Sequence, residues 1–471
     1  MRKRCLFAVT TMLAGLAAPA FADPIVVRLA SKDLLTTNPQ DVAHIERIEA
    51  ALAAKGKEID IQILDLPSSG YADALTAQML AGDIPDLIYF QGGDAQMAEQ
   101  GVLTDLRPYI EASENIKEAL WPQNAARLEN YPYLLYVYPP RNPQPVIRKS
   151  WLEQAGMDAP TTLEGYQALF TAIRDGDFDG NGQADSVGLT SADTTAELDS
   201  IFNRAFGIDA SWLKDESGAW IRARVSPQER EKITWYAALA ADGLYDKDYV
   251  TTKWDLKEDK FYTGRAGVIF GSSAEVIDIY GGKVRQLEPD AELVLLAPPS
   301  GPGGQGLQAV DTSKETRGFA ISALAPDEVK QAAFDVLDFV ASPEGQKMER
   351  MGFEGTEYTT NADGSITFAP AISTWYVRFI NAANWQPPGS WMSSAAQGSL
   401  KTTQEGFVPD NAFVFPAEFA PQLDATENVY REWMYKFISG NAPLSEWDTY
   451  VAEWNAAGGT ALTDYARSVL P

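Results

Sequence analysis

The segment from residue 177 to 185 reads Asp-Phe-Asp-Gly-Asn-Gly-Gln-Ala-Asp, so oxygen-bearing side chains recur at alternate positions. A hard cation such as calcium binds roughly six to eight oxygen atoms, and alternate residues of a tight loop direct their oxygens inward. Gly182 stands at the sixth position of such a loop, where the backbone turns sharply and needs a positive φ. The spacing predicts a structural calcium site whose ligands are Asp177, Asp179, Asn181, Asp185 and the backbone carbonyl of Gln183.

This loop departs from the EF-hand pattern at its twelfth position. Gly188 stands there, so the bidentate glutamate of an EF-hand is missing. We therefore expect water or a neighbouring oxygen to complete the coordination shell of a metal that holds structure and does not switch it. The alternative is a surface turn rich in Asp and Asn that binds no metal.

Aromatic residues are the second chemical signal, with 12 Trp, 19 Tyr and 20 Phe. Aromatic rings cover the apolar faces of a pyranose, while carboxylates, amides and guanidiniums bind its hydroxyls. Several Trp lie beside Gly, Pro, Ser or Asn, which is typical of loops, although packing in a core or lobe interface is the alternative for each. The predicted sugar-binding residues are Trp254, Trp375, Tyr376, Trp385, Trp391, Asp86, Gln91, Ser272, Arg317 and Asn384. In contrast, Trp433, Trp447 and Trp454 have the helical spacing of core residues.

The first 22 residues have the pattern of a signal peptide. A basic start, Arg2 to Arg4, precedes the apolar run Leu6 to Leu16 and the cleavage motif Ala20-Phe21-Ala22. No later stretch approaches the roughly 20 apolar residues of a membrane helix. Cys5 does not follow a lipobox, so we expect no lipid anchor. These features predict export to the periplasm, with cleavage after Ala22.

Composition excludes several classes of function. The formal net charge of −27 disfavours binding to nucleic acid and to anionic lipid headgroups. A single histidine, His44, excludes a zinc site built from several histidines. His44 lies in the helical pattern of residues 42–54, where we expect it to pack and not to catalyse.

The elements alternate in the first part of the chain. Predicted strands Ile25–Ala30, Ile59–Leu64 and Asp86–Phe90 alternate with helices Pro39–Ala54 and Tyr71–Ala81. This order is typical of a mostly parallel sheet, whose strands carry ligand-binding loops at their carboxyl ends. Further predicted strands are Leu134–Tyr138, Val146–Lys149, Ser186–Leu189, Leu293–Ala297 and Gly318–Ser322; further helices are Pro160–Arg174, Gln228–Leu239, Pro326–Ala341 and much of 412–471.

Three segments resemble one protein family. They are Gly82–Tyr89 (Gly-Asp-Ile-Pro-Asp-Leu-Ile-Tyr), Val146–Leu152 with Gly156 and Pro160-Thr161-Thr162, and Phe261–Gly267. With the loop at Asp177, the chain resembles the extracellular solute-binding proteins (family 1) of ABC importers, in the large oligosaccharide-binding group similar to alginate-binding proteins.

The resemblance implies an α/β, two-lobed periplasmic-binding-protein fold (type II-like). Each lobe is expected to hold a mostly parallel sheet flanked by helices, with an additional helical C-terminal region. The expected N-terminal lobe comprises 23–145 and 300–365, the C-terminal lobe 146–299 and 366–471, and the crossings lie near 139–146, 298–306 and 360–370. The family also implies a structural calcium in the lobe after the first crossing, where Ser186 stands in place of a frequent acidic residue.

The expected function is the periplasmic substrate-binding component of an ABC importer. It would capture a carbohydrate of two or more units by lobe closure and deliver it to the membrane permease, as a monomer without catalysis. The ligand would be anionic if Arg141, Arg148, Arg265 and Arg317 formed a basic pocket. The alternatives are a secreted carbohydrate-active enzyme with paired carboxylates and structural calcium, or a binding protein for a polyamine or peptide.

Overall fold

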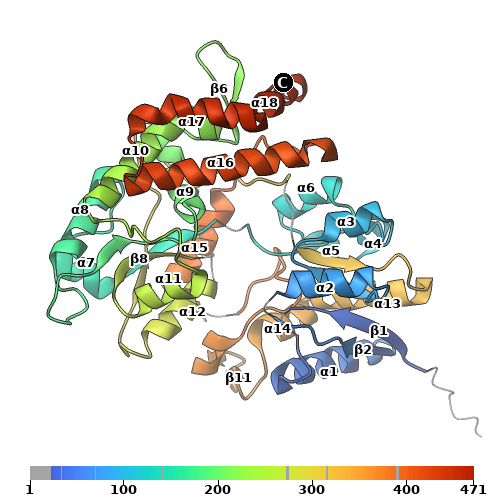
Figure 1. Ribbon diagram of the computed structural model, residues 1–471. Helices are drawn as coiled ribbons and strands as arrows, with labels where there is room; N and C mark the ends of the chain where they lie inside the picture. The colour runs from blue at the N-terminus through green and yellow to red at the C-terminus, as the bar shows by residue number, and fades with distance from the viewer. Residues whose placement is uncertain are drawn as a thin grey trace, which may run out of the picture.

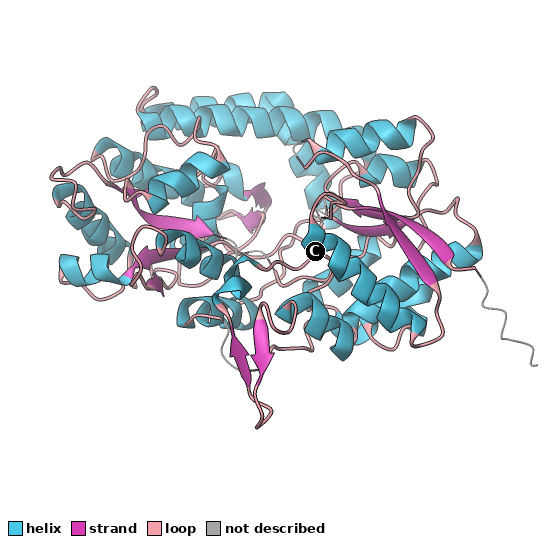
Figure 2. Ribbon diagram, turned by 90° about the horizontal axis from the view of Figure 1, so that it is seen from below, coloured by secondary structure: helices cyan, strands magenta, loops and turns pink. Residues whose placement is uncertain are grey.

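The computed structural model describes residues 23–471 except 33, 69, 141, 272–274, 314–316 and 389–391. The predicted signal peptide, Ser272 and Trp391 lie outside the described residues. The chain forms two bodies, each built around a four-stranded sheet, with the C-terminal helices beside them (Figure 1). Figure 2 shows the two sheets well apart, each with helices packed around it. The predicted two-lobed α/β fold is confirmed.

The first sheet has the strand order β10-β3-β1-β2. Strand β1 pairs in parallel with β2 and β3, and β10 pairs antiparallel with β3. All four residues of β3 are buried, as a strand covered on both faces requires. The strand bounds are β1 Ile25–Ala30, β2 Ile59–Ile63, β3 Leu87–Phe90 and β10 Gly318–Ile321.

Helices cover this first sheet. Helix α1 buries Ile45, Ile48 and Leu52 at helical spacing, and Asn38 caps it by accepting a hydrogen bond from the Gln40 N–H. The helix bounds of this body are α1 Pro39–Ala53, α2 Tyr71–Leu80, α3 Asp94–Glu99, α4 Arg107–Ala112, α5 Ile116–Ala119, α6 Pro122–Asn130, α13 Asp327–Ala341 and α14 Pro343–Met351.

The second sheet has the strand order β5-β8-β4-β9. Only β5 and β8 pair in parallel within it, because β4 runs antiparallel to both of its neighbours. The expectation of a mostly parallel second sheet is therefore wrong. The strand bounds are β4 Gln144–Arg148, β5 Val187–Leu189, β8 Ala266–Gly271 and β9 Leu293–Leu295. The chain enters this body through β4, directly after it leaves the first body. The direction of β4 is therefore set by that connection and not by a βαβ unit.

The helices of the second body include α8, which leads into the predicted calcium loop. Thr162 caps α8 through a hydrogen bond from the Gly165 N–H, and Leu163, Tyr166 and Phe170 form part of its buried face. The helix bounds are α7 Lys149–Ala155, α8 Leu163–Asp175, α9 Ala196–Phe202, α10 Pro227–Ala241, α11 Trp254–Tyr262, α12 Glu275–Val284 and α15 Ser394–Glu405.

The C-terminal region is helical, as predicted. Helix α16 (Ala420–Ser439) lies along α10, and α17 (Trp447–Trp454) and α18 (Thr460–Val469) follow it (Figure 1). Trp433, Trp447 and Trp454 are buried in the core that these helices share with the second body. Their helical spacing had indicated this packing.

Other segments differ from expectation or connect the two bodies. Residues 134–138 do not form a strand, although Leu135 bridges to Phe319 of β10. Two hairpins, β6 (Trp212–Lys214) with β7 (Trp220–Arg222) and β11 (Tyr358–Thr360) with β12 (Ile366–Phe368), complete the sheets.

The segment after β12 packs on the first body. The Trp375 indole donates a hydrogen bond to the Glu349 carbonyl of α14, at 2.7 Å, and the Phe379 ring stacks on Phe319 with ring centroids 5.4 Å apart. Helix α15 then packs against β9 of the second body. The predicted lobe boundaries themselves remain predictions. Among the described helices, none is long and apolar enough to cross a membrane.

Candidate binding cavity and metal loop

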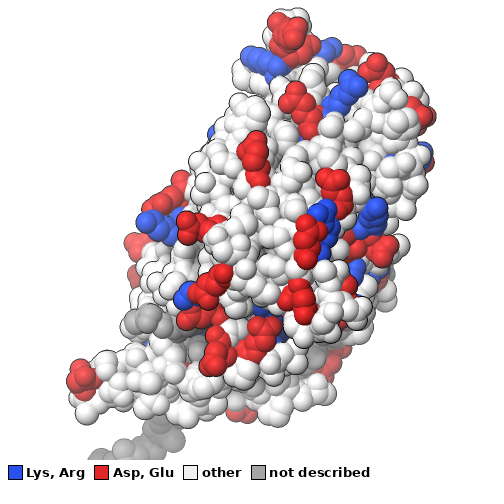
Figure 3. All heavy atoms as spheres, turned by 90° about the vertical axis from the view of Figure 1, so that its left-hand side faces the viewer, with Lys and Arg blue, Asp and Glu red and all other residues white. Residues whose placement is uncertain are grey.

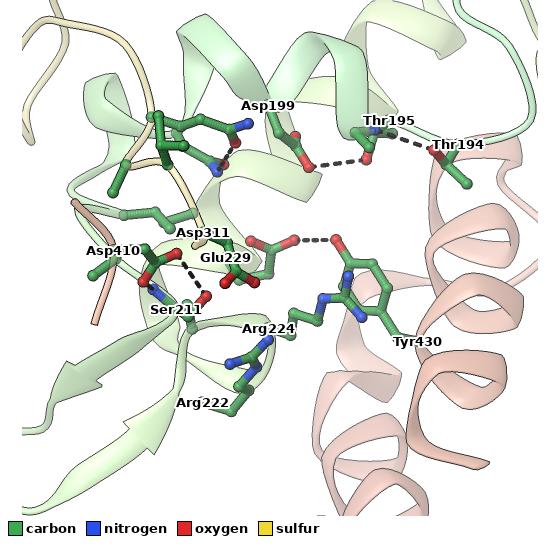
Figure 4. A pocket seen from close by; sticks show the side chains of 18 of the residues that line it. Thr194, Thr195, Asp199, Ser211, Arg222, Arg224, Glu229, Asp311, Asp410 and Tyr430 are labelled. Carbon is green, nitrogen blue, oxygen red and sulfur yellow. Dashed lines mark hydrogen bonds between the residues drawn. The ribbon is translucent and has the colours of Figure 1, made fainter. Parts of the chain in front are cut away.

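A cavity of about 430 Å³ lies beside the N-terminal end of α10. Helices α9, α10 and α16 and strand β7 form its wall on one side (Figure 4). Arg127 of α6 and Tyr136 line it from the part of the chain that belongs with the first sheet, and residues 308–311 contribute a connecting segment. The lining is rich in charged groups, with Lys232 and several arginines facing several carboxylates.

Lys232 organises the charges at the base of this cavity. Its ammonium lies 2.9 Å from Asp199 and 3.0 Å from Glu229, and it donates a hydrogen bond to the Asn203 amide oxygen. Burial opposes the charge of Lys232, but Asp199 and Glu229 outweigh it and raise the Lys232 pKa. Burial also raises the pKa of Glu229, whose carboxylate accepts a hydrogen bond from the Tyr430 hydroxyl at 2.8 Å.

Two arginines from the β7 end stand next to this group (Figure 4). Arg224 forms an ion pair with Glu427 of α16, and its guanidinium lies 4.3 Å from the centre of the Tyr430 ring. Arg222 also lines the cavity, but among the described residues it has neither an ion pair nor a hydrogen bond from its side chain. Its guanidinium lies 5.2 Å from the centre of the Trp212 ring.

Backbone strain marks one edge of the cavity. Asp193 has a positive φ of 65°, which no other non-glycine residue shows in the described part of the chain. Thr194 and Thr195 follow it and line the cavity, and Asp193 pairs with Arg431 of α16 at 2.7 Å. A residue held at positive φ costs energy, and such residues concentrate at binding and active sites.

Of the predicted sugar-binding residues, the structure brings Arg317 to this cavity. Trp375 is buried instead, with its ring edge against His44 and the Arg378 guanidinium 4.3 Å from its ring centre. Tyr376 donates a hydrogen bond to Asp41 at 3.0 Å, and Arg378 lies over its ring as well. Trp375 and Tyr376 thus contribute to the first body's packing, and neither lines the described cavity.

The remaining described candidates are spread over the surface. Trp254 exposes 45% of its area, donates to Glu258 and has the Lys257 ammonium 3.5 Å from its ring centre. Asp86 accepts a hydrogen bond from the Arg28 N–H, which joins β3 to β1. Gln91 and Trp385 are partly buried, and Asn384 is exposed, away from the described cavity lining.

The arginines named for a basic pocket do not gather. Arg148 is buried and pairs with Glu288, while Arg265 pairs with Asp259 on the surface. Arg317 alone of the described ones lines the cavity, and Arg141 lies outside the described residues.

Sequence reasoning missed the residues that dominate the cavity, among them Arg222, Arg224, Lys232 and Tyr430. One signal was available. Glu229 and Lys232 are in helical phase with the apolar residues Ile233 and Tyr236, so they fall on the buried face of α10. Charged residues on a buried face need partners, and such partners often form a functional site.

The predicted calcium loop connects the end of α8 to β5, as expected. Gly182 has φ of +87°, and its N–H donates to the Asp177 carboxylate at 2.9 Å. The Asn181 amide nitrogen donates to both Asp179, at 2.9 Å, and Asp185, at 3.1 Å. The local spacing thus draws the two carboxylates toward one amide.

The donor set suits a hard cation in type and placement, because its atoms are carboxylate, amide and carbonyl oxygens on one short loop. In the part of the chain that the structure describes, no three acidic, histidine or cysteine side chains are already gathered as around a metal. The Asn181 amide would have to rotate so that its oxygen replaces its nitrogen. Gly188 has no side chain that could serve as a further ligand. A larger residue would not fit there, because its Cβ would lie 2.5 Å from the Phe170 Cβ.

Two of the three segments that suggested the family, those containing Trp151 and Gly264, meet around this loop. A Cβ on Gly264 would lie 2.5 Å from the Asp179 Cβ, so the loop packs directly on that backbone. The Ser186 hydroxyl donates to the Gly264 carbonyl at 2.7 Å. Phe178 packs on Trp151 of α7 with ring centroids 5.3 Å apart. The loop therefore joins the end of α8 to α7 and to the turn before β8.

Comparisons with known proteins agree with this fold. A family model described as bacterial extracellular solute-binding protein matches residues 43–347. YtcQ of Bacillus subtilis, named a polygalacturonan/rhamnogalacturonan-binding protein, is 20% identical over 425 residues, or 85% of this chain and 83% of that protein.

Two solved structures share the fold over most of their length. The alginate-binding protein AlgQ2, solved without calcium ion, is 16% identical with a TM-score of 0.64 and covers 95% of this chain and 98% of its own. An EF-hand mutant of FusA from S. pneumoniae, solved with fructo-nystose, is 18% identical with a TM-score of 0.63 and the same coverage. The predicted resemblance is confirmed, and the chain belongs to the bacterial extracellular solute-binding proteins.

Proposed function

We propose that this protein is the periplasmic substrate-binding component of an ABC importer and that it binds an oligosaccharide in the cavity beside α10. The main supporting observation is a polar cavity in a solute-binding fold, lined by residues from both bodies of the chain. The names of YtcQ and FusA, a polygalacturonan/rhamnogalacturonan-binding and a fructooligosaccharide-binding protein, support a carbohydrate ligand.

The cavity chemistry suits a sugar. Its volume of about 430 Å³ lies within the range of roughly 300–1,000 Å³ for small-molecule sites. Carboxylate, amide, guanidinium and hydroxyl groups line it, and these bind sugar hydroxyls as donors or acceptors. Tyr136 and Tyr430 add aromatic surface for the apolar faces of a pyranose.

Binding would be coupled to lobe closure. Arg127 and Tyr136 lie on one side of the cavity, whereas α9, α10 and α16 line the other. A ligand that contacts both sides binds the closed arrangement more tightly and shifts the population toward it. The permease of the importer would then recognise the closed, loaded form, with the binding protein acting as a monomer.

We regard the protein as a binding protein and not a glycosidase. A glycosidase needs one carboxylic acid that gives up a proton and one carboxylate that attacks or activates water. In this cavity Asp199 and Glu229 both converge on the Lys232 ammonium, which holds them as ion-pair partners. This arrangement suits a fixed binding surface better than proton transfer.

The loop at residues 177–185 is proposed to bind a structural calcium ion. Support comes from its oxygen donors and from the positive φ of Gly182. Further support comes from two similar proteins, since FusA has been solved as an EF-hand mutant and AlgQ2 without its calcium ion. The ion would fix the end of α8 against Gly264 and supply no chemistry to the sugar site.

A thermal-shift screen of the mature chain tests the sugar proposal. A ligand that binds only the native state stabilises it by about 2.7 kcal/mol at a hundredfold excess over Kd. We expect one class of di- to tetrasaccharides to raise Tm and to be recovered uncleaved by chromatography. Stabilisation by amines or peptides alone would overturn the proposal, and cleavage products would establish the glycosidase.

The calcium proposal has its own test. Asp179→Asn is compared with Asp363→Asn, because each carboxylate accepts a hydrogen bond from the backbone N–H two residues later in an exposed turn. We expect chelation to lower Tm of the wild type and of Asp363→Asn, but to have little effect on Asp179→Asn. Equal responses of all three proteins to chelation, or none, would show that the loop is a metal-free turn.

A further inference from the structure

Arg222 is a partly buried cation in the cavity whose side chain, apart from its contact with the Trp212 ring, has no ion pair or hydrogen bond among the described residues. It ends β7 and lines both the cavity of about 430 Å³ and a neighbouring cavity of about 400 Å³, so it stands in the wall between them. Burial, together with the nearby Arg224, lowers the pKa of Arg222 to about 10. The side chain therefore remains protonated at neutral pH.

The carboxylates near Arg222 are bound to other groups. Glu427 pairs with Arg224. Asp410 accepts hydrogen bonds from the N–H and the hydroxyl of Ser211, both at 2.8 Å. Asp311 accepts from the N–H and hydroxyl of Ser313, at 2.8 and 2.6 Å. Each of these acids thus has a local donor, and none contacts the Arg222 guanidinium within ion-pair distance.

A partly buried charge without an ion-pair partner is unfavourable, and an incoming anion would relieve part of that cost. The planar guanidinium offers paired N–H donors whose geometry matches a carboxylate. Across the same cavity, the Lys232 ammonium offsets one of the two negative charges of Asp199 and Glu229, so these carboxylates repel an anion near Arg222 less than an unpaired couple would.

We propose that Arg222 binds a carboxylate of the ligand, so that the bound oligosaccharide is an acidic one that contains uronic acid units. This inference rests on the proposed sugar-binding function and specifies its substrate class. The Arg224–Glu427 pair would lie beside the acidic unit, and the Arg222 fork would fix the orientation of that unit in the cavity.

The test measures binding by calorimetry with three probes: trigalacturonate, its fully methyl-esterified form and maltotriose. The first two differ only at their carboxyl groups, which are charged in the acid and neutral, with an added methyl group, in the ester. We expect trigalacturonate to bind and the ester to bind at least about tenfold more weakly, as for loss of a charged hydrogen bond. In Arg222→Gln, binding of trigalacturonate should fall by about 10- to 100-fold, whereas Arg222→Lys should retain part of it.

Arg230→Gln is the matched control, because Arg230 is exposed on α10 and does not line the cavity. This variant should bind trigalacturonate as the wild type does. Binding of maltotriose or the ester in preference to the acid would overturn the acidic-ligand inference and leave the sugar proposal intact. Binding of the acid that is unaffected in Arg222→Gln would overturn the role of Arg222. Failure of every saccharide would count against the proposed function itself.

Discussion

Lys232 shows how single residues hold the cavity together. Its side chain is almost fully buried, and its ammonium contacts Asp199 and Glu229 from two helices, α9 and α10. The Tyr430 and Tyr236 hydroxyls donate to the same two carboxylates, at 2.8 and 3.0 Å. The cavity wall is therefore a closed network in which each charge depends on the others.

Replacing Lys232 with Met should leave both carboxylates without a counterion. Breaking a buried ion pair from one side costs about 3–5 kcal/mol, and we expect the urea midpoint of Lys232→Met to fall accordingly. Lys247→Met is the control, because Lys247 is exposed and surface changes usually stay within about 0.5 kcal/mol. Equal midpoints for both variants would show that the carboxylates find other partners.

His44 provides a pH-dependent contribution to stability from the first body. Burial lowers its pKa from 6.5, and Arg47 acts in the same direction by donating a hydrogen bond to Nδ1. Nε2 lies 2.7 Å from the Glu349 carboxylate, so the neutral ring donates there. As pH falls below 6.5, the unfolded chain takes up a proton on His44 that the folded chain does not.

The folded state should therefore lose stability as pH falls from about 7 to 5, by at most about 1.4 kcal/mol per pH unit from this group. His44→Gln should remove this loss, because a glutamine amide could donate to Glu349 and accept from Arg47 without titrating. His44 is the one histidine of the chain, so the difference between the two urea-unfolding series isolates it. The raised pKa of Glu229 acts in the opposite sense but cancels in the difference. Parallel curves would show that the folded chain protonates His44 as readily as the unfolded chain does.

At the scale of elements, the loop proposed to bind calcium is approached closely by the turn before β8. Gly264 has φ of +80°, and a Cβ there would lie 2.5 Å from the Asp179 Cβ. Gly264→Ala should cost about 1–3 kcal/mol through strain and overlap, and it should weaken the stabilisation by calcium.

Gly243→Ala serves as the control for backbone strain alone. Gly243 has φ of +72°, but a Cβ there would meet nothing closer than Arg174 Cδ at 3.7 Å. Calcium should therefore raise the Tm of Gly243→Ala as much as that of the wild type. An equal calcium response in Gly264→Ala would mean that the loop does not need this contact.

Elements were predictable where local signals decide them. Helix α1 begins at Pro39 and α10 spans Pro227–Ala241, close to the predicted bounds. These bounds were predictable because the apolar spacing and the capping residues that define a helix lie within a few residues of one another. Strand direction in the second sheet was not predictable, since β4 pairs with strands more than a hundred residues away. The short run Leu134–Tyr138 has strand composition but makes only an isolated bridge to β10.

The same distinction holds for the two candidate sites. The proposed metal loop could be named from sequence, and it stays a prediction, because its candidate donors lie within nine consecutive residues. The cavity could not, because Arg222, Lys232 and Tyr430 meet only through the folding of β7, α10 and α16. Trp375 shows why aromatic sugar-binding residues were hard to predict. Its neighbours in sequence are typical of a loop, but they do not indicate that its indole is buried against Glu349.

For the whole molecule, the charge distribution fits a diffusing binding protein. The net charge is −27, and the face in Figure 3 carries scattered acidic side chains with basic ones among them and no continuous basic patch. Basic groups are instead found in the cavity, where Arg222, Arg224 and Lys232 lie together. The cavity lining carries six cations against five carboxylates, so it repels an anion less than the strongly acidic molecule does as a whole.

The last prediction concerns motion of the two bodies. The cavity is lined by Arg127 and Tyr136 on one side and by α9, α10 and α16 on the other, so a ligand held there links the two. A ligand that contacts both sides binds the more compact arrangement more tightly. The larger this difference in affinity, the further the ligand shifts the population toward the compact arrangement. The radius of gyration from small-angle scattering should therefore decrease when the mature protein is saturated with its oligosaccharide.

Arg222→Gln, at a trigalacturonate concentration that saturates the wild type but not the variant, should keep the larger radius of gyration. The wild type with maltotriose should keep it too, because that sugar lacks the carboxylate. A ligand that calorimetry shows bound, but that leaves the radius unchanged, would mean that the two bodies are already closed without ligand. In that case the importer would have to distinguish loaded from empty protein by some property other than the distance between the two bodies.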